Sequence, residues 1–127
     1  MTPTAKVVSL LKQNCDKLPG LKPEHIHAFM IKPNDWSKTD CVVRVSELPA
    51  GSHEYGNLNP ISVRRAVQVE FYYPTNYTKD MGLTEEAVKS FLFAHRIRCE
   101  SDAGHVITPD NGNIENTLKF NFTEEEM

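Results

Sequence analysis

Hydrophobic residues recur along this chain with two spacings, one typical of helices and the other typical of strands. Over residues 3–14 the spacing is helical, and Thr2 followed by Pro3 supplies the capping hydroxyl and the first-turn proline of a helix start. A second helix is predicted over residues 84–98, where Thr84 precedes two glutamates that suit the positive end of a helix dipole. Its inward stripe would comprise Ala87, Val88, Phe91, Leu92 and His95. We therefore expect two amphipathic helices that each need a surface to cover.

Alternation of apolar and polar residues predicts strands in the rest of the chain. The expected strands span residues 24–31, 40–47, 63–73, 105–108 and 114–122. The pattern is strictest over residues 63–73, where one face would carry Val63, Arg65, Val67, Val69, Phe71 and Tyr73. Asp110-Asn111-Gly112 is a strong signal for a tight hairpin between the last two strands.

The predicted order of elements is α-β-β-β-α-β-β, which is typical of the α+β class. Short connections favour a mostly antiparallel sheet of about five strands, with the two helices packed on one face. The opposite face would carry Arg64, Gln68, Glu70, Glu115, Thr117 and Lys119 toward solvent or a neighbour. We expect a single domain over residues 1–127, in which residues 123–127 form a flexible acidic tail.

The segment between the second and third predicted strands, residues 49–62, is long for a loop in so small a domain. It holds Tyr55, Leu58 and Ile61 among glycines and asparagines. Aromatic and aliphatic side chains are costly to leave in water, so we expect this loop to order against a partner. A flexible hairpin tip is the alternative.

Two further features bear on binding, one in the second predicted helix and one shared between that helix and the strand predicted over residues 63–73. Phe93 and Ile97 lie four residues apart, outside the inward stripe, which indicates either a wider core or a contact with another subunit. Arg64-Arg65 and His95-Arg96-x-Arg98 group cations that could contact phosphates. Cations near a helix end also suit its negative carbonyl groups, and no nucleic-acid motif accompanies them.

Composition narrows the classes of function. Fourteen Lys and Arg against 17 Asp and Glu give a net charge of −3, so no overall cationic field favours nucleic acid or an anionic membrane. The apolar runs are too short to span a membrane, and the first residues lack a signal-peptide core. We expect a soluble protein made in a cytoplasm, with no membrane partner.

The histidines raise the question of a metal site. His25 and His27 would place two imidazoles on one face of a strand, where His53 or His105 could add a third ligand. The spacing does not require these side chains to converge, so our interpretation is ordinary histidines and no metal. A small metal-dependent enzyme that uses His25 and His27 stays open as an alternative.

The cysteines and the motif content argue against the common enzyme classes. Cys15, Cys41 and Cys99 show no CxxC spacing, which favours free thiols over a disulfide framework or a zinc knuckle. Cys99 follows Arg98, but the predicted helix end there opposes thiolate formation. The chain contains no GxSxG, HExxH, GxGxxG or GK[ST] motif. We therefore expect no enzyme activity and no cofactor.

Several features in order along the chain carry a resemblance to a known family. They are the opening Met1-Thr2-Pro3 that leads into a short helix, the element Tyr55-Gly56-Asn57, the strand Val67-Gln68-Val69-Glu70-Phe71-Tyr72-Tyr73, and a second helix followed by a terminal hairpin. In these the chain resembles small tail proteins from long-tailed phages of low-GC Gram-positive bacteria, which are related in architecture to tail terminators. The resemblance covers most of the chain and carries over no catalytic residue.

The resemblance implies a structural virion protein of the phage tail or neck, assembled in the host cytoplasm. Such a protein forms a ring, a hexamer by analogy, that caps the tail tube, ends its polymerisation and joins tail to head. Its partners would be its own copies, the tail-tube protein and a head connector or neck protein, with DNA only passing through the lumen. The expected contact residues are Tyr55, Leu58, Ile61, Arg64, Phe93, Arg96 and Ile97. Another neck, head-closure or tail-tube component is the alternative within this class.

Overall fold

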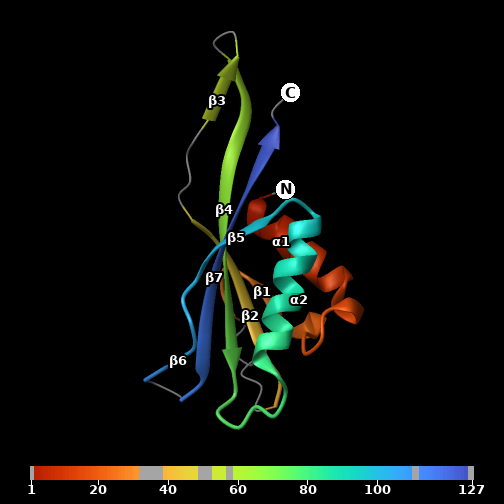
Figure 1. The fold of residues 1–127 in the computed structure, drawn as a ribbon, viewed down its shortest axis with the longest axis vertical. Coiled ribbons are helices and arrows are strands. Elements are labelled where there is room, and N and C mark those ends of the chain that lie inside the picture. The colour runs from red at the N-terminus through yellow and green to blue at the C-terminus, as the bar shows by residue number, and fades with distance from the viewer. Residues whose placement is uncertain (1, 32–38, 49–52, 57–58, 110–111, 126–127) are drawn as a thin grey trace.

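The computed structural model describes residues 2–31, 39–48, 53–56, 59–109 and 112–125, with the backbone alone for residues 53–56, 59–62 and 124–125. Two helices, α1 (Pro3–Gln13) and α2 (Met81–Ala94), lie on one side of a sheet (Figure 1). The strands of the described residues are β1 (Ile26–Ala28), β2 (Val42–Leu48), β3 (His53–Gly56), β4 (Asn59–Tyr73), β5 (Arg98–Asp102), β6 (Val106–Ile107) and β7 (Ile114–Glu125). Short 3-10 turns span Cys15–Lys17 and Pro23–His25.

The seven described strands form one mixed sheet in the order β1-β2-β4-β7-β5, with β3 added to β4 and β6 added to β7. Strand β1 runs parallel to β2, and the other pairs are antiparallel. The α+β class predicted from the sequence is confirmed. The sheet is mixed because the chain passes from β1 to β2 through residues 29–41, which is long enough to return to the same end of the sheet.

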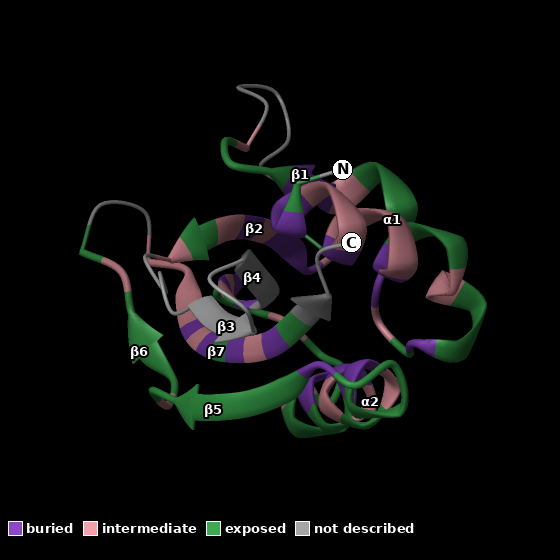
Figure 2. Cartoon of the chain, turned by 90° about the horizontal axis from the view of Figure 1, so that it is seen from above, coloured by how far each residue is buried: buried purple, intermediate pink, exposed green. Residues whose placement is uncertain are grey.

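The core lies between the two helices and the sheet (Figure 2). Strand β4 supplies its centre: Val67, Val69, Phe71 and Tyr73 are all fully buried. The rings of Phe71 and Tyr73 stack with their centroids 6.2 Å apart. Val7 and Leu11 from α1 and Val88 and Leu92 from α2 pack onto this surface from the helix side. The inward stripe predicted for the second helix, apart from His95, and the apolar face predicted for residues 63–73 are therefore largely correct.

The boundaries of α2 differ from the predicted helix 84–98, and hydrogen bonds explain why. At its start, Asp80 Oδ1 accepts from the backbone N–H of Leu83 at 3.1 Å, so Asp80 is the cap. The hydroxyl of Thr84, expected to cap the helix, instead donates to the carbonyl of Pro19 at 2.8 Å. The helix thus begins three residues earlier than the sequence suggested.

At its other end, α2 stops at Ala94 in a Schellman motif. Arg96 adopts a left-handed backbone with φ 65°, its N–H donates to the carbonyl of Phe93, and the N–H of Ile97 donates to that of Leu92, both at 2.9 Å. The motif turns the chain and buries Ile97 completely against the core. Ile97 therefore does not lie on a helix beside Phe93, and His95, expected to face inward, is exposed.

Three other segments also differ from their predicted boundaries. Strand β1 covers only Ile26–Ala28 of the predicted 24–31, because a 3-10 turn ends at His25 and Phe29 adopts a left-handed backbone with φ 64°. Part of the predicted loop 49–62 is a β-hairpin, in which β3 pairs with the start of β4 and extends beyond the helices (Figure 1). The acidic tail begins later than predicted, since residues 123–125 continue β7 and pair with β4.

The sheet face away from the helices is less open than the sequence predicted. Glu70 lies on this face yet is only 2% exposed. Its carboxylate accepts hydrogen bonds from Arg44, its direct partner on β2, from Tyr72, and from Gln68 at 2.6 Å. Burial raises the pKa of Glu70, but these hydrogen bonds outweigh it and hold the pKa below its ordinary value. The cluster ties β2 to β4 from the outside.

We expect Phe71→Ala to destabilise the domain by about 3–5 kcal/mol, since it removes a buried aromatic ring from the central strand. Urea unfolding followed by circular dichroism measures the change. A loss near zero would contradict the assignment of Phe71 to the core.

Arg44→Met should lower the free energy of unfolding at pH 7 by roughly 1–3 kcal/mol, because it leaves the Glu70 carboxylate buried with fewer donors. In the wild type the lowered pKa of Glu70 contributes stability that is lost as the pH falls below its ordinary value of 4.5. Without Arg44 burial dominates and the pKa rises. The penalty of the substitution should therefore shrink in acid, as measured by urea unfolding at pH 7 and at pH 3.5.

The exposed Lys119, on the same face, provides the control. Lys119→Met should change stability little at either pH. A penalty for Arg44→Met that is equal at both pH values would show that Arg44 does not act through the carboxylate.

Candidate functional site

Cross-strand pairing brings four polar side chains to one end of the sheet. Arg98, the first residue of β5, lies opposite Asn121 on β7, and Arg64 on β4 lies opposite Thr123. Directly paired residues, and residues two apart on a strand, project from the same face of a sheet. Arg64, Arg98, Asn121 and Thr123 therefore share a face, because of the register of three strands.

The turn after α2 adds a third arginine to this end of the sheet. Arg96 occupies the left-handed position of the Schellman motif, which favours glycine. A side chain in this backbone conformation costs roughly 1–2 kcal/mol. Strain of this kind is often retained at functional sites, so an arginine here points to a role for its side chain.

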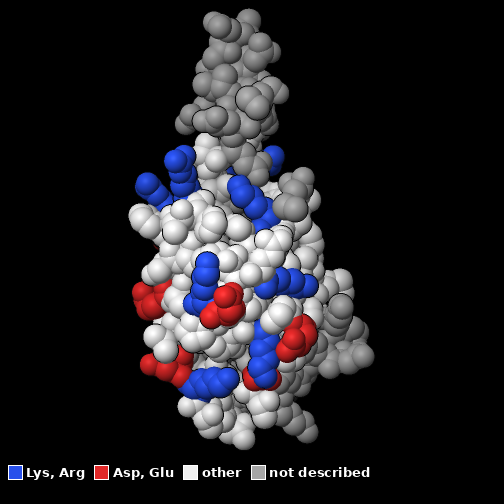
Figure 3. Space-filling model, turned by 90° about the vertical axis from the view of Figure 1, so that its right-hand side faces the viewer, with Lys and Arg blue, Asp and Glu red and all other residues white. Residues whose placement is uncertain are grey.

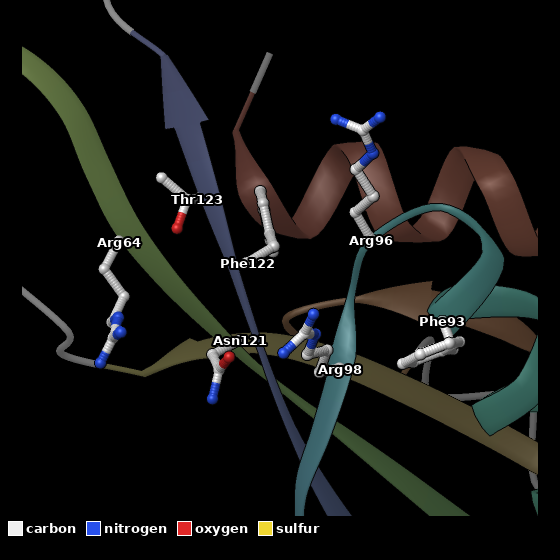
Figure 4. A pocket seen from close by; sticks show the side chains of 7 residues that line it. All are labelled: Arg64, Phe93, Arg96, Arg98, Asn121, Phe122 and Thr123. Atoms are coloured by element: carbon white, nitrogen blue, oxygen red, sulfur yellow. The ribbon is translucent and has the colours of Figure 1, made fainter.

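These residues line a pocket of about 540 Å³, which we call the arginine pocket (Figure 4). Its lining residues are Arg64, Phe93, Arg96, Arg98, Asn121, Phe122 and Thr123. Arg98 lies near its centre, between Asn121 and Phe93, with its guanidinium 5.9 Å from the centroid of the Phe93 ring. Phe93 is 63% exposed, so it offers an apolar surface beside three cations.

One described carboxylate reaches the wall of the arginine pocket, where Glu100 Oε2 accepts from Asn121 Nδ2 at 3.2 Å, but it makes no ion pair with the arginines. Among the described residues, the ion pairs of carboxylates involve Lys22, His25, Arg44, Lys89 and His105, and none reaches Arg64, Arg96 or Arg98. Figure 3 shows Lys and Arg side chains gathered at the upper end of one face, while both signs mix lower down. Three guanidinium groups around one hollow repel each other, so the pocket favours an anion.

A second hollow of about 500 Å³ adjoins the arginine pocket and shares Phe93 and Arg98 with it. It is lined by Lys89, Ser90, Phe93, Arg98 and Cys99. Here the cation is neutralised, since Lys89 Nζ lies 2.8 Å from the carboxylate of Asp102 and 3.3 Å from that of Glu86. Lys89 therefore adds no unbalanced charge to this hollow, and Arg98, which has no ion pair among the described residues, is the cation that the two hollows share.

Beside the arginine pocket, β7 has a free edge. Strand β5 pairs with β7 only as far as Asn121, whereas β7 continues to Glu125 paired with β4. Within the described residues, the edge of β7 beyond Asn121 that faces away from β4 has no strand partner. Backbone N–H and C=O groups on such an edge are available to an added strand.

The structure brings together some of the predicted contact residues. Arg64, Phe93 and Arg96 line the arginine pocket, whereas Ile97 is in the core. Tyr55 and Ile61 lie in β3 and β4 with side chains outside the described part, and Leu58 is wholly outside it. From its sequence context Arg98 is predicted only to contact phosphates, and no pattern in the sequence singles out Asn121, Phe122 and Thr123. Only the strand register, which the sequence does not show, places them beside the arginines.

A second polar cluster is centred on Glu85, which is only 3% exposed. Its carboxylate accepts from Tyr73 Oη at 2.6 Å and from Asn116 Nδ2 at 2.8 Å, and lies 2.8 Å from His105 Nε2. Burial, followed by the nearby Cys41 and Glu85, raises the pKa of Tyr73, so the phenol stays a hydrogen-bond donor. This cluster ties α2 to β4, to β7 and to the segment before β6.

The predicted placement of the two histidines on one strand face is wrong. His25 ends the 3-10 turn before β1, with Nε2 3.6 Å from Asp40 Oδ2, and His27 is buried within β1. His105, considered as a third ligand, binds Glu85 instead. The described residues contain no group of three or more His, Cys, Asp or Glu side chains placed to hold a metal ion.

The thiols are poor candidates for nucleophiles. Cys41 is buried as predicted, and Cys15 is half-buried against the core. Cys99 is exposed on β5, not at a helix end, so the electrostatic reason given for it from the sequence is wrong. Burial of its sulfur still raises the pKa of Cys99, which favours the protonated thiol.

No helix among the described residues is long and apolar enough to cross a membrane. In comparisons with known proteins, the chain matches no family model and no curated protein.

Proposed function

We propose that this chain is a structural protein of a phage tail that forms a ring on the end of the tail tube, ends its polymerisation and contributes to the head-tail junction. The observation that supports an assembly role most directly is the arginine pocket, where Arg64, Arg96 and Arg98 line one hollow together with the exposed Phe93. Aromatic and arginine side chains in one patch are typical of protein interfaces. The resemblance of the sequence to small phage tail proteins supports the choice of a tail.

The geometry also fits what a closed ring requires. A ring needs two different patches on each subunit, so that successive copies make the same contact around an axis. The arginine pocket is one such patch. The hairpin of β3 and β4, which extends beyond the helices, is a separate projecting element (Figure 1). Its sequence carries Tyr55 and Ile61, the residues expected to contact a partner.

Light-scattering mass after gel filtration, at low and high protein concentration, tests the proposal, with purified tail tubes added in a parallel sample. We expect rings, or binding confined to tube ends seen by electron microscopy, and over-long tails when the protein is missing. Continuous polymers would favour a tube protein, and binding to the head connector alone would favour a head-closure protein. A monomer that ignores tubes and connector would contradict the assembly role.

Phe93→Ala should weaken ring formation or tube binding at least tenfold, since a buried aromatic anchor contributes about 1.4 kcal/mol or more to an interface. Its thermal unfolding should barely change, because Phe93 is 63% exposed in the single chain. Leu83→Ala is the matched control, since Leu83 is an exposed apolar residue near the other end of α2. Equal effects of the two substitutions would contradict a specific role of Phe93.

A further inference from the structure

A partner bound at the arginine pocket has to pair with charged arginine side chains and also with the unpaired backbone groups of a strand edge. Arg64, Arg96 and Arg98 call for negative charge, and guanidinium groups pair best with carboxylates or phosphates. The free edge of β7 next to them calls for the backbone of another extended chain. A phosphate meets only the first requirement. An extended polypeptide segment rich in carboxylates meets both.

This chain carries such a segment itself. Thr123 is followed by Glu124, Glu125 and Glu126, the longest run of like charge in the sequence. The backbone of Glu124 and Glu125 is already extended, since β7 holds these residues opposite Val63 and Ser62 of β4. The strand end therefore needs little ordering before it binds, which lowers the entropic cost of association.

We infer that the arginine pocket receives the acidic strand end of a second copy of this chain, with Glu124 and Glu125 of that copy placed against Arg96 and Arg98. The free edge of β7 in one copy pairs with the same edge of β7 in the other, so this contact joins copies in pairs, and Phe93 covers it from the helix side. A ring then also needs a second patch, such as the β3–β4 hairpin. This inference rests on the proposed function only in requiring that copies of the chain associate.

Charge exchange tests the contact in both directions. The acidic-pocket variant, Arg96→Glu with Arg98→Glu, and the basic-end variant, Glu124→Arg with Glu125→Arg, should each associate at least tenfold more weakly than the wild type, because each brings like charges together. An equimolar mixture of the two variants restores opposite charges at each contact between unlike copies. We expect the light-scattering mass of this mixture to return to that of the wild type.

Three controls distinguish the loss of the proposed contact from effects of misfolding and from effects of net charge. Arg96→Gly removes a guanidinium at a position that favours glycine, so it should weaken association without lowering the melting temperature. Lys119→Glu with Lys12→Glu changes the net charge as much as the acidic-pocket variant does, at exposed residues outside the pocket, and should leave association unchanged. Association of the wild type should also weaken between low and high salt.

If the isolated wild type is a monomer, binding of a peptide to the arginine pocket tests the same contact. A fluorescent peptide with the sequence of residues 119–127 should bind the wild type but not the acidic-pocket variant, and the same peptide with its glutamates changed to glutamines should not bind. The inference would be overturned if the mixture of the two variants stayed at the low mass of each variant alone and the peptide did not bind the wild type. Binding of a DNA oligonucleotide to the arginines in place of the peptide would overturn it in favour of phosphate.

These outcomes separate the inference from the proposed function. Rings that form equally well in all variants would leave the proposed assembly role intact and disprove this contact. Peptide binding by a monomer that ignores tail tubes would support the contact and count against the tail role.

Discussion

The alternation along β4 is the constraint on which the rest of the structure depends. This strand pairs with β2, β3 and β7, and its two faces have opposite chemistry. One face buries Val69 and Phe71 under the helices, while the other holds Glu70 in its cluster with Arg44. A slip of one residue would expose the apolar face and bury an unpaired charge, so the register is strongly specified. The same register places Arg64 opposite Thr123 and so helps to build the arginine pocket.

The sequence predicts the centre of this fold well because local pattern and burial agree there. The strict alternation of residues 63–73 identifies β4, and the apolar stripes identify the inward faces of α1 and α2. Strands β6 and β7 pair in antiparallel fashion as expected for a hairpin, while Asp110 and Asn111 of the predicted turn lie outside the described residues. Each of these features depends on spacing within one segment, which a sequence displays directly.

The errors lie where tertiary contacts override local preference. Thr84 looks like a helix cap, but Asp80 takes that role and frees Thr84 to bind Pro19. No glycine marks the end of α2, because Arg96 takes the left-handed position where glycine is expected. The helical spacing of apolar residues in the sequence therefore extends to Ile97, although the structure places Ile97 in the core after the helix has ended. For the same reason, no strand is predicted from the sequence where β5 lies. The cations of the arginine pocket are visible in the sequence, but the register that places Asn121 and Thr123 beside them is not.

We propose that the end of the sheet around the arginine pocket is an interface between copies of the chain. Amide hydrogen exchange of the wild type, compared between its dissociated state and its assembled state on tail tubes, tests this most directly. We expect slower exchange on assembly at residues 122–125, where the free edge of β7 becomes paired, and at residues 96–98 beside it. Unchanged exchange at both segments, with protection elsewhere, would contradict it.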